Sequence, residues 1–260
     1  MDRSAWRRIA VIPARLASTR LPRKVLLDAT GKYLIQHVYE SIAQARSIDG
    51  ACIATDSQEV AEAASRFGAP VFLTRADHPS GTDRMAEVVA AHPAVAIAVN
   101  VQGDEPQVRP ADVDLLVELL EQSDADVATL AAPCPPDRIH DTAAVKVVTD
   151  LRGRALYFSR SPIPYPRYPA ALQEAGRTQL VHVGMYGYRR AALERFAQLR
   201  PSPLERTESL EQLRLLENGM SIAVGTIERA PEGVDTPADY ERFVAQWRRA
   251  HPGPGSPSSL

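Results

Sequence analysis

The feature that most constrains this chain is the alternation, through its first half, of short apolar runs with amphipathic segments. The apolar runs have strand length, end at polar or turn-forming residues, and cover 9–12, 51–55, 70–73, 95–101 and 127–131. Between them apolar residues recur at helical spacing, as at Val60, Ala63, Ala64 and Phe67. Uniformly apolar strands separated by amphipathic helices indicate an α/β fold: a mixed, largely parallel sheet flanked by helices on both faces.

The pattern changes after about residue 140. Three further runs, 144–148, 155–159 and 183–189, have strand character but no full helix between them, and 161–180 is rich in proline and polar residues. We therefore expect an antiparallel portion, inserted at about 140–200, that carries a mobile loop.

Two helices are expected near the end of the chain. One covers about 204–218, before an Asn-Gly pair, and the other begins at Thr236. Asp239 completes a capping box with Thr236, and Pro237 occupies the favoured first-turn position. The second helix therefore has a well-defined start.

The sequence shows no internal repeat and no linker, so we expect a single domain over residues 1–250. The last ten residues, 251–260, lack periodicity and are predicted to be disordered. The apolar run before Pro13 is too short for a signal peptide or a membrane span. Cys52 and Cys134 lie in apolar stretches, which favours buried free thiols over a disulfide or zinc site. These features predict a cytoplasmic protein without membrane insertion.

One basic segment follows the first predicted strand. Between Trp6 and Leu27 there are six basic residues and no acidic one, although the whole chain has a net charge of −2. The chain therefore lacks the global basic field that holds nucleic acid, and any anion site must be local. The centre of the segment, 15–24, follows the strand end where an open α/β sheet places its ligand crevice.

Phosphate is the ligand that this segment suggests. It contains no glycine and is not a Walker loop, so side-chain guanidinium, ammonium and hydroxyl groups would bind the anion beside any backbone N–H donors. These groups belong to Arg15, Ser18, Thr19, Arg20, Arg23 and Lys24. The alternative is a solvated basic loop. No G-x-G-x-x-G follows the strand, which argues against a dinucleotide oxidoreductase.

Carboxylates provide a second candidate element. Asp104 and Glu105 stand just beyond the apolar strand 95–101, and Mg²⁺ takes one or two carboxylates when phosphates and waters complete its coordination. Asp104 is a candidate ligand, although taken alone the GDEP sequence indicates a polar turn. Asp235 precedes the capped helix and would point to the same sheet edge if the last crossover returns there. Its alternative role is an ordinary aspartate at a helix N-terminus.

Other polar residues are ambiguous from sequence alone. His78 lies in a turn-rich stretch and His182 precedes an apolar strand, and neither has zinc-ligand spacing. Most isolated histidines are structural, and the sequence alone leaves the role of these two open. Three glutamates recur every three residues on one predicted helix, with a glutamine beside them. They form either a solvated helix face or a set of carboxylates that binds sugar hydroxyls. This group is Glu205, Glu208, Glu211 and Gln212.

Seven segments, in order, resemble the CMP-KDO synthetases, also called 3-deoxy-manno-octulosonate cytidylyltransferases. They are 11–24, 74–84, 99–106, 144–164, 182–190, 202–214 and 233–241, so the resemblance covers about residues 8–248. It implies a nucleotide-diphospho-sugar transferase fold of the glycosyltransferase-A type, dependence on Mg²⁺ and a homodimer. It also implies conversion of CTP and KDO to CMP-KDO and pyrophosphate, which activates KDO for lipopolysaccharide synthesis.

The resemblance also implies roles for residues. The nucleotide-binding set is Arg15, Ser18, Thr19, Arg20 and Lys24 for the phosphates, with Ser80, Gly81 and Thr82 near the cytosine. Asp104 and Asp235 match the metal ligands and, with Arg15 and Lys24, make up the implied catalytic set. The sugar-binding set is Gln102, Arg160, His182, Tyr186, Glu211 and Gln212.

Two positions depart from the family pattern. Arg23 stands where glycine is usual, beside the implied triphosphate site, and Tyr33 stands where proline is usual. Arg23 therefore puts the geometry of the basic loop in question. Two alternatives to KDO activation stay open: activation of another sugar acid, such as an amino-substituted octulosonate or a sialate, and a nucleotide-sugar sensor without turnover.

Overall fold

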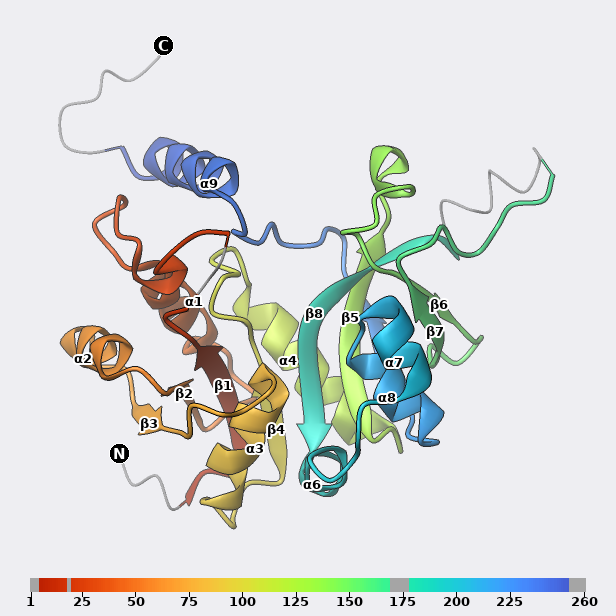
Figure 1. Cartoon of the computed structure of the whole chain (residues 1–260), viewed down its shortest axis with the longest axis horizontal. Helices are drawn as coiled ribbons and strands as arrows, with labels where there is room; N and C mark the ends of the chain where they lie inside the picture. Colours follow the sequence, from red (N-terminus) through yellow and green to blue (C-terminus); the bar gives the residue numbers. More distant parts are fainter. Residues whose placement is uncertain (1–4, 18–19, 169–177, 253–260) are drawn as a thin grey trace.

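The fold is given by a computed structural model that describes residues 5–17, 20–168 and 178–252. Its strands form one sheet in the order β3-β2-β1-β4-β8-β5-β9, with β6 and β7 attached beside β8 (Figure 1). The strands are β1 (Arg8–Ala14), β2 (Gly50–Thr55), β3 (Val71–Leu73), β4 (Ile97–Asn100), β5 (Val127–Pro133), β6 (Lys146–Thr149), β7 (Ala155–Ser159), β8 (Leu180–Arg189) and β9 (Ile222–Thr226).

Strand direction differs between the two halves of the sheet. β1 pairs in parallel with β2 and β4, and β2 pairs in parallel with β3, as the alternating pattern predicts. β8 is antiparallel to both of its main neighbours, β4 and β5, while β5 and β9 are parallel. The prediction of a mixed, helix-flanked α/β sheet is confirmed.

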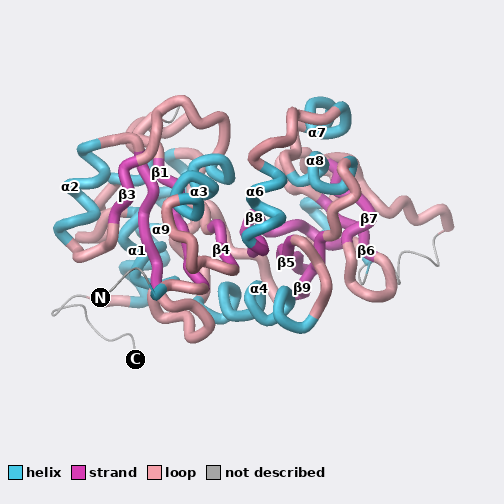
Figure 2. The backbone as a smooth tube through the Cα atoms, turned by 90° about the horizontal axis from the view of Figure 1, so that it is seen from below, coloured by secondary structure: helices cyan, strands magenta, loops and turns pink. Residues whose placement is uncertain are grey.

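Helices cover both faces of the sheet, as Figure 2 shows. α1, α2 and α4 pack on one face, through a core that includes Ile35, Val60 and Leu116. α3, α6 and α8 pack on the other face, around Met85 and Phe196. The helices are α1 (Leu34–Ile42), α2 (Gln58–Arg66), α3 (Gly81–Ala90), α4 (Pro110–Gln122), α6 (Arg190–Phe196), α7 (Pro203–Glu208), α8 (Gln212–Glu217) and α9 (Pro237–Ala250), with short 3-10 turns η2 (Lys24–Leu26) and η3 (Pro136–Arg138).

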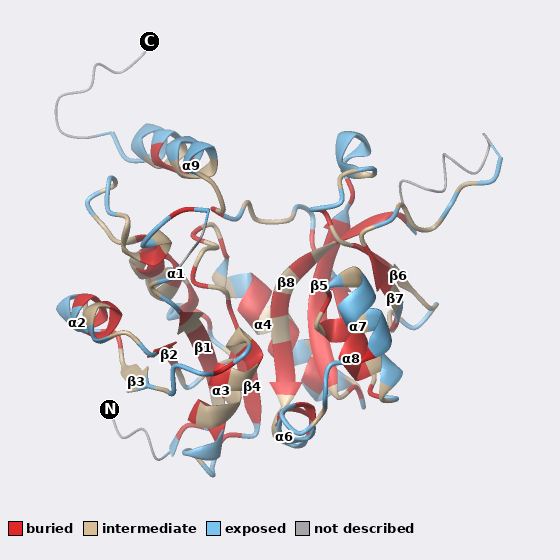
Figure 3. Cartoon of the chain, in the orientation of Figure 1, coloured by how far each residue is buried: buried red, intermediate tan, exposed pale blue. Residues whose placement is uncertain are grey.

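The central strands are buried, and the exposed residues lie mainly on the helices and loops around them (Figure 3). β4 is buried along its whole length, which explains its uniformly apolar sequence. Both cysteines, Cys52 and Cys134, are buried thiols, as expected. Among the described helices, none has the length and apolar character that crossing a membrane requires.

The region 140–200 combines two kinds of structure. β6 and β7 form an antiparallel pair beside the main sheet, whereas β8 runs through the middle of that sheet. The predicted loop 161–180 lies partly outside the described residues, and so does most of the predicted tail 251–260.

The single helix expected over 204–218 is wrong. Ser209 has a φ of 53°, in the left-handed region, and separates α7 from α8. The residues before and after Ser209 therefore belong to two helices and do not share one continuous helix face. By contrast α9 begins as predicted, with Pro237 in its first turn and a Thr236–Asp239 capping box.

Candidate active site

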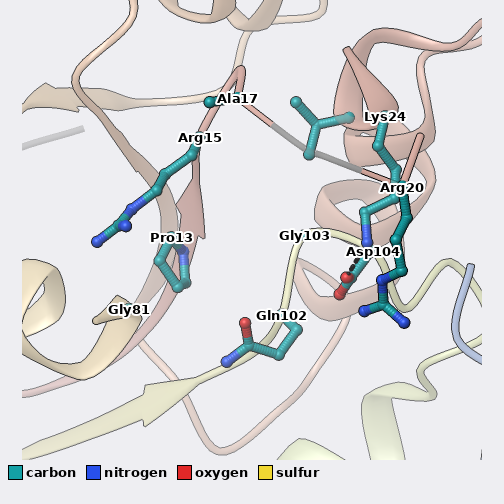
Figure 4. A pocket seen from close by; sticks show the side chains of 10 residues that line it. Pro13, Arg15, Ala17, Arg20, Lys24, Gly81, Gln102, Gly103 and Asp104 are labelled. Atoms are coloured by element: carbon teal, nitrogen blue, oxygen red, sulfur yellow. Dashed lines mark hydrogen bonds and ion pairs between the residues drawn. The ribbon is translucent and has the colours of Figure 1, made fainter. Parts of the chain in front are cut away.

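A polar pocket of about 370 Å³ opens where β1 and β4 end. This is the carboxyl edge of the parallel strands, where open α/β sheets place their ligands. The pocket is lined by Pro13, Arg15, Ala17, Arg20, Lys24, Val25, Gly81, Gln102, Gly103 and Asp104. Figure 4 shows Lys24, Arg20 and Asp104 gathered on one side of it and Arg15 on the other. The pocket therefore joins the basic loop, the start of α3 and the GDEP turn.

Lys24 holds the two predicted metal ligands together. Its Nζ lies 2.5 Å from Asp104 Oδ2 and 3.0 Å from Asp235 Oδ1. The two carboxylates come from distant segments, which meet because the Val234 backbone N–H donates to the Asp104 carbonyl at 2.8 Å. The structure thus brings both carboxylates to one cation, at the edge that the sequence predicts.

The surroundings favour positive charge at this point. Burial alone would lower the pKa of Lys24, but Asp104 and Asp235 outweigh burial and raise the pKa above its ordinary value. The Lys24 side chain is only 12% exposed, so its charge is poorly screened by solvent. Two carboxylates that converge on one cation also fit Mg²⁺, whose remaining ligands would be phosphates and water.

The other predicted phosphate-binding residues lie around the same pocket. Arg15 donates to the carbonyl of His78, which holds the guanidinium across the pocket from Lys24. Arg20 pairs with Asp235 at 3.0 Å. Ser18 and Thr19 lie outside the described residues.

The predicted cytosine residues begin α3. Ser80 is the N-cap, and its hydroxyl accepts from the Asp83 backbone N–H. Gly81 lies so close to β1 that an added Cβ would be 2.9 Å from Pro13 Cγ, so a larger residue would displace one wall of the pocket. Thr82 is buried, and its hydroxyl points to Glu211 instead of into the pocket.

The predicted sugar-binding residues fall into two groups. His182 and Tyr186 lie on β8 with their rings 5.3 Å apart, and Gln102 lines the pocket itself. Burial lowers the pKa of His182 to about 3, so its imidazole is neutral at physiological pH, with Nε2 2.9 Å from the Thr129 hydroxyl.

The second group surrounds α7 and α8. Glu211 lies just before α8, and Gln212 is buried at its start. Arg160 donates to the carbonyls of Thr142, Glu208 and Ser209, and so ties the end of β7 to the end of α7.

The three glutamates do not form a solvated face. Glu205 pairs with the buried Arg214, whose guanidinium donates to both carboxylate oxygens. Glu208 accepts from Ser159, and Glu211 accepts from Thr82. The solvated-face alternative is therefore wrong, because each carboxylate is held by a partner from the protein.

Two polar groups near the site were not assigned from sequence. Arg84, on α3, is fully buried and pairs at 3.2 Å with Asp56, which follows β2. The carboxylate of Glu105 lies near Gly184, where an added Cβ would be 3.6 Å from Glu105 Oε1. Burial, with the neighbouring carboxylates Asp104, Asp112 and Asp235, raises its pKa to about 8. The sequence offered one clue to the Arg84 ion pair, namely Asp56 directly after a predicted strand. It offered no clue to the direction of the Glu105 side chain.

The two departures from the family pattern differ in their effect on the backbone. Tyr33 has a φ of −62°, which proline also adopts, so this departure leaves the backbone unchanged. Arg23 has a φ of 57° immediately before η2, and its guanidinium pairs with Glu59 on α2. Arg23 thus occupies a left-handed position that favours glycine.

We expect the Arg23→Gly variant to be more stable than Arg23→Ala by about 1 kcal/mol, because both lose the Glu59 pair but only alanine keeps a Cβ in the left-handed region. Urea unfolding of the two variants measures the difference. Equal free energies of unfolding would show that this turn leaves the left-handed conformation once the pair is lost.

Comparisons with known proteins agree with this geometry. Residues 9–222 match the cytidylyltransferase family. A 3-deoxy-manno-octulosonate cytidylyltransferase of Syntrophotalea carbinolica is 49% identical, over 92% of this chain and 98% of its own. The protein of the same name from Escherichia coli is 46% identical, over 91% of this chain and 94% of its own.

Solved structures give the same relationship. The structure of a CMP:2-keto-3-deoxy-manno-octonic acid synthetase complexed with CTP is 43% identical, with a TM-score of 0.88, and the match covers 94% of this chain and 99% of that one. A cytidylyltransferase from Leptospira borgpetersenii, 18% identical with a TM-score of 0.59 over 92% of this chain and 85% of its own, shares the fold. The chain therefore belongs to the cytidylyltransferase family, among the 3-deoxy-manno-octulosonate cytidylyltransferases.

Proposed function

We propose that this protein transfers the cytidylyl group of CTP to 3-deoxy-manno-octulosonate and releases pyrophosphate. The observation that carries the proposal is the convergence of Lys24, Asp104 and Asp235 at the edge of a pocket ringed by further basic side chains. Such a site suits a triphosphate accompanied by a divalent cation. Relatives that cover almost the whole chain carry the name of this reaction.

In the proposed reaction the anomeric hydroxyl of the sugar acid attacks the α-phosphorus of CTP in line. The P–O bond to the β-phosphate breaks, pyrophosphate leaves, and the hydroxyl proton passes to solvent. The protein mainly orients the two substrates and neutralises negative charge. Arg15 and Arg20 approach from opposite sides of the pocket and would hold the triphosphate between them.

Asp104 and Asp235 would hold Mg²⁺, which when bound supplies Lewis-acid polarisation of the α-phosphate. Lys24, which already lies within 3.0 Å of both carboxylates, keeps them oriented and would neutralise phosphate charge beside them. No described side chain is placed as an obligatory general base; positioning and charge neutralisation carry the proposed reaction.

The nucleotide is expected to be CTP, with ATP and GTP used at less than about a hundredth of its rate, because a site that hydrogen-bonds one base leaves buried polar groups unpaired with the wrong base. Pyrophosphate release with KDO, Mg²⁺ and each nucleotide measures this. Comparable rates with ATP and CTP would contradict the proposal.

The acceptor needs its own test. Pyrophosphate release from CTP with KDO, an amino-substituted octulosonate and a sialate separates KDO activation from the same chemistry on another acid. No release with any acid, together with retained CTP binding, would indicate a sensor instead. We further propose a cytoplasmic homodimer whose product supplies lipopolysaccharide synthesis, which fractionation and the solution mass of the protein would test.

A further inference from the structure

Two adjacent residues at the start of α3 contact different parts of the molecule: Gly81 the pocket and Thr82 the carboxylate of Glu211. Gly81 lines the pocket, packed against Pro13 and within 3.9 Å of Gln102 when a Cβ is added. Thr82, the next residue, is only 3% exposed, and its hydroxyl donates to Glu211 Oε2 at 2.6 Å. A single helical turn therefore touches both the nucleotide pocket and a carboxylate of the sugar-binding set.

A line of polar side chains continues this contact back to the pocket wall. Gln102, which lines the pocket, donates to Asn100 Oδ1 at 3.4 Å. Asn100 is buried and donates in turn to the Thr82 hydroxyl, also at 3.4 Å. Thr82 thus accepts from one side and donates to the other, which fixes the direction of its hydroxyl toward Glu211. Figure 4 shows Gly81 and Gln102 close to each other along the pocket.

Glu211 depends on these hydroxyl contacts. It occupies the N-cap position of α8, where its side chain makes no capping hydrogen bond to that helix. Burial raises the pKa of Glu211, whereas its hydrogen bonds to Ser80 and Thr82 act in the opposite direction and favour the charged carboxylate. Removing a hydroxyl donor would leave the carboxylate less well oriented and less ionised.

We propose that Thr82 is a positioning residue that orients Glu211 for the sugar acid and makes binding of the sugar acid depend on occupancy of the nucleotide pocket. The inference rests on the proposed function, because Glu211 is assigned to the sugar through it. A nucleotide packed against Gly81 fixes the first turn of α3, and with it the Thr82 hydroxyl. By linkage, CTP then tightens binding of the sugar acid, and the sugar acid tightens binding of CTP by the same factor.

The test uses Thr82→Val, which removes the hydroxyl and keeps the shape. We expect the KM for KDO to rise about tenfold to a hundredfold, the cost of losing a hydrogen bond to a charged group, while CTP binding in the absence of KDO changes less than about twofold. KDO titrations with and without a non-cleavable α,β-methylene CTP analogue measure the coupling directly. The wild type should bind KDO more tightly when the analogue is present, and the variant should not.

Three further variants complete the experiment. Thr82→Ser retains the hydroxyl and should restore the KM for KDO. Thr30→Val removes a hydroxyl that contacts His37, away from the pocket, and should leave the KM for KDO and CTP binding unchanged. Glu211→Gln changes the carboxylate that Thr82 contacts. In the double variant Thr82→Val/Glu211→Gln, the KM for KDO should rise by less than the product of the two single-variant increases.

Each outcome separates the inference from the proposed function. A wild type without turnover on CTP and KDO would reject the function itself. An active wild type whose Thr82→Val variant loses CTP binding while KDO binding is unchanged would make Thr82 a nucleotide residue and overturn the inference. Unchanged kinetics in a folded Thr82→Val variant would also overturn it. If that variant fails to fold, Thr82→Ser and the Glu211→Gln titrations with the CTP analogue decide the question.

Discussion

Asp104→Asn and Asp235→Asn are each expected to lower turnover on the order of a hundredfold or more, because an amide is a much weaker Mg²⁺ ligand than a carboxylate. Both variants should fold, since an amide of similar size can still accept a hydrogen bond from Lys24. Turnover at saturating Mg²⁺ and thermal unfolding measure the two expectations. Mn²⁺ binding followed by electron paramagnetic resonance gives a readout that does not depend on catalysis, and it should weaken in both variants.

Asp124→Asn is the matched control. Asp124 is 88% exposed and pairs with Arg154, away from the pocket, so the same chemical change there should alter neither turnover nor Mn²⁺ binding. Near-normal turnover of either pocket variant at saturating Mg²⁺ would remove that residue from the metal site. Lost turnover with unchanged Mn²⁺ binding would assign the carboxylate to orienting Lys24 instead.

The alternation of strands and helices was sufficient to predict the first half of the fold. The inner parallel strands there, β1, β2 and β4, are buried on both faces and each connecting helix buries one face, so the sequence pattern follows directly from the architecture. The central place of β8 carries no such local signal, because it depends on pairing with β4 and β5, far away in the chain. The turn at Ser209 was missed because serine is uncommon at positive φ and resembles a helical residue in sequence.

The placement of the candidate site residues was predictable wherever a residue directly follows a strand or precedes a helix. Asp104 and Asp235 satisfied that condition; the rule that ligands gather at carboxyl strand ends predicts the edge for Asp104, and Asp235 was expected there if the last crossover returned to it. Their shared contact with Lys24 depends on a backbone hydrogen bond between Val234 and Asp104. No local sequence pattern predicts this bond, because the two residues are far apart in the chain. The bond from Thr82 to Glu211 spans 129 residues and was missed for the same reason.

Lys24→Ala and Arg15→Ala are expected to reduce kcat/KM for CTP by roughly tenfold to a hundredfold, the cost of losing one charge-assisted contact to phosphate. Arg7→Ala and Arg8→Ala should change it little. All four residues belong to the same basic segment, so the comparison separates direct phosphate contacts from a diffuse attraction of the nucleotide. Steady-state kinetics of the four variants at two salt concentrations provide the measurement.

The structure explains why the four losses should be unequal. Arg8 begins β1, where it pairs with Glu121, and Arg7 precedes it, whereas Arg15 follows the other end of the strand. A seven-residue strand places these ends roughly 20 Å apart. That separation exceeds the Debye length of about 8 Å at physiological salt, so Arg7 and Arg8 contribute little to the potential in the pocket. Comparable losses in all four variants, shrinking together as salt rises, would mean that the segment attracts nucleotide without binding its phosphates.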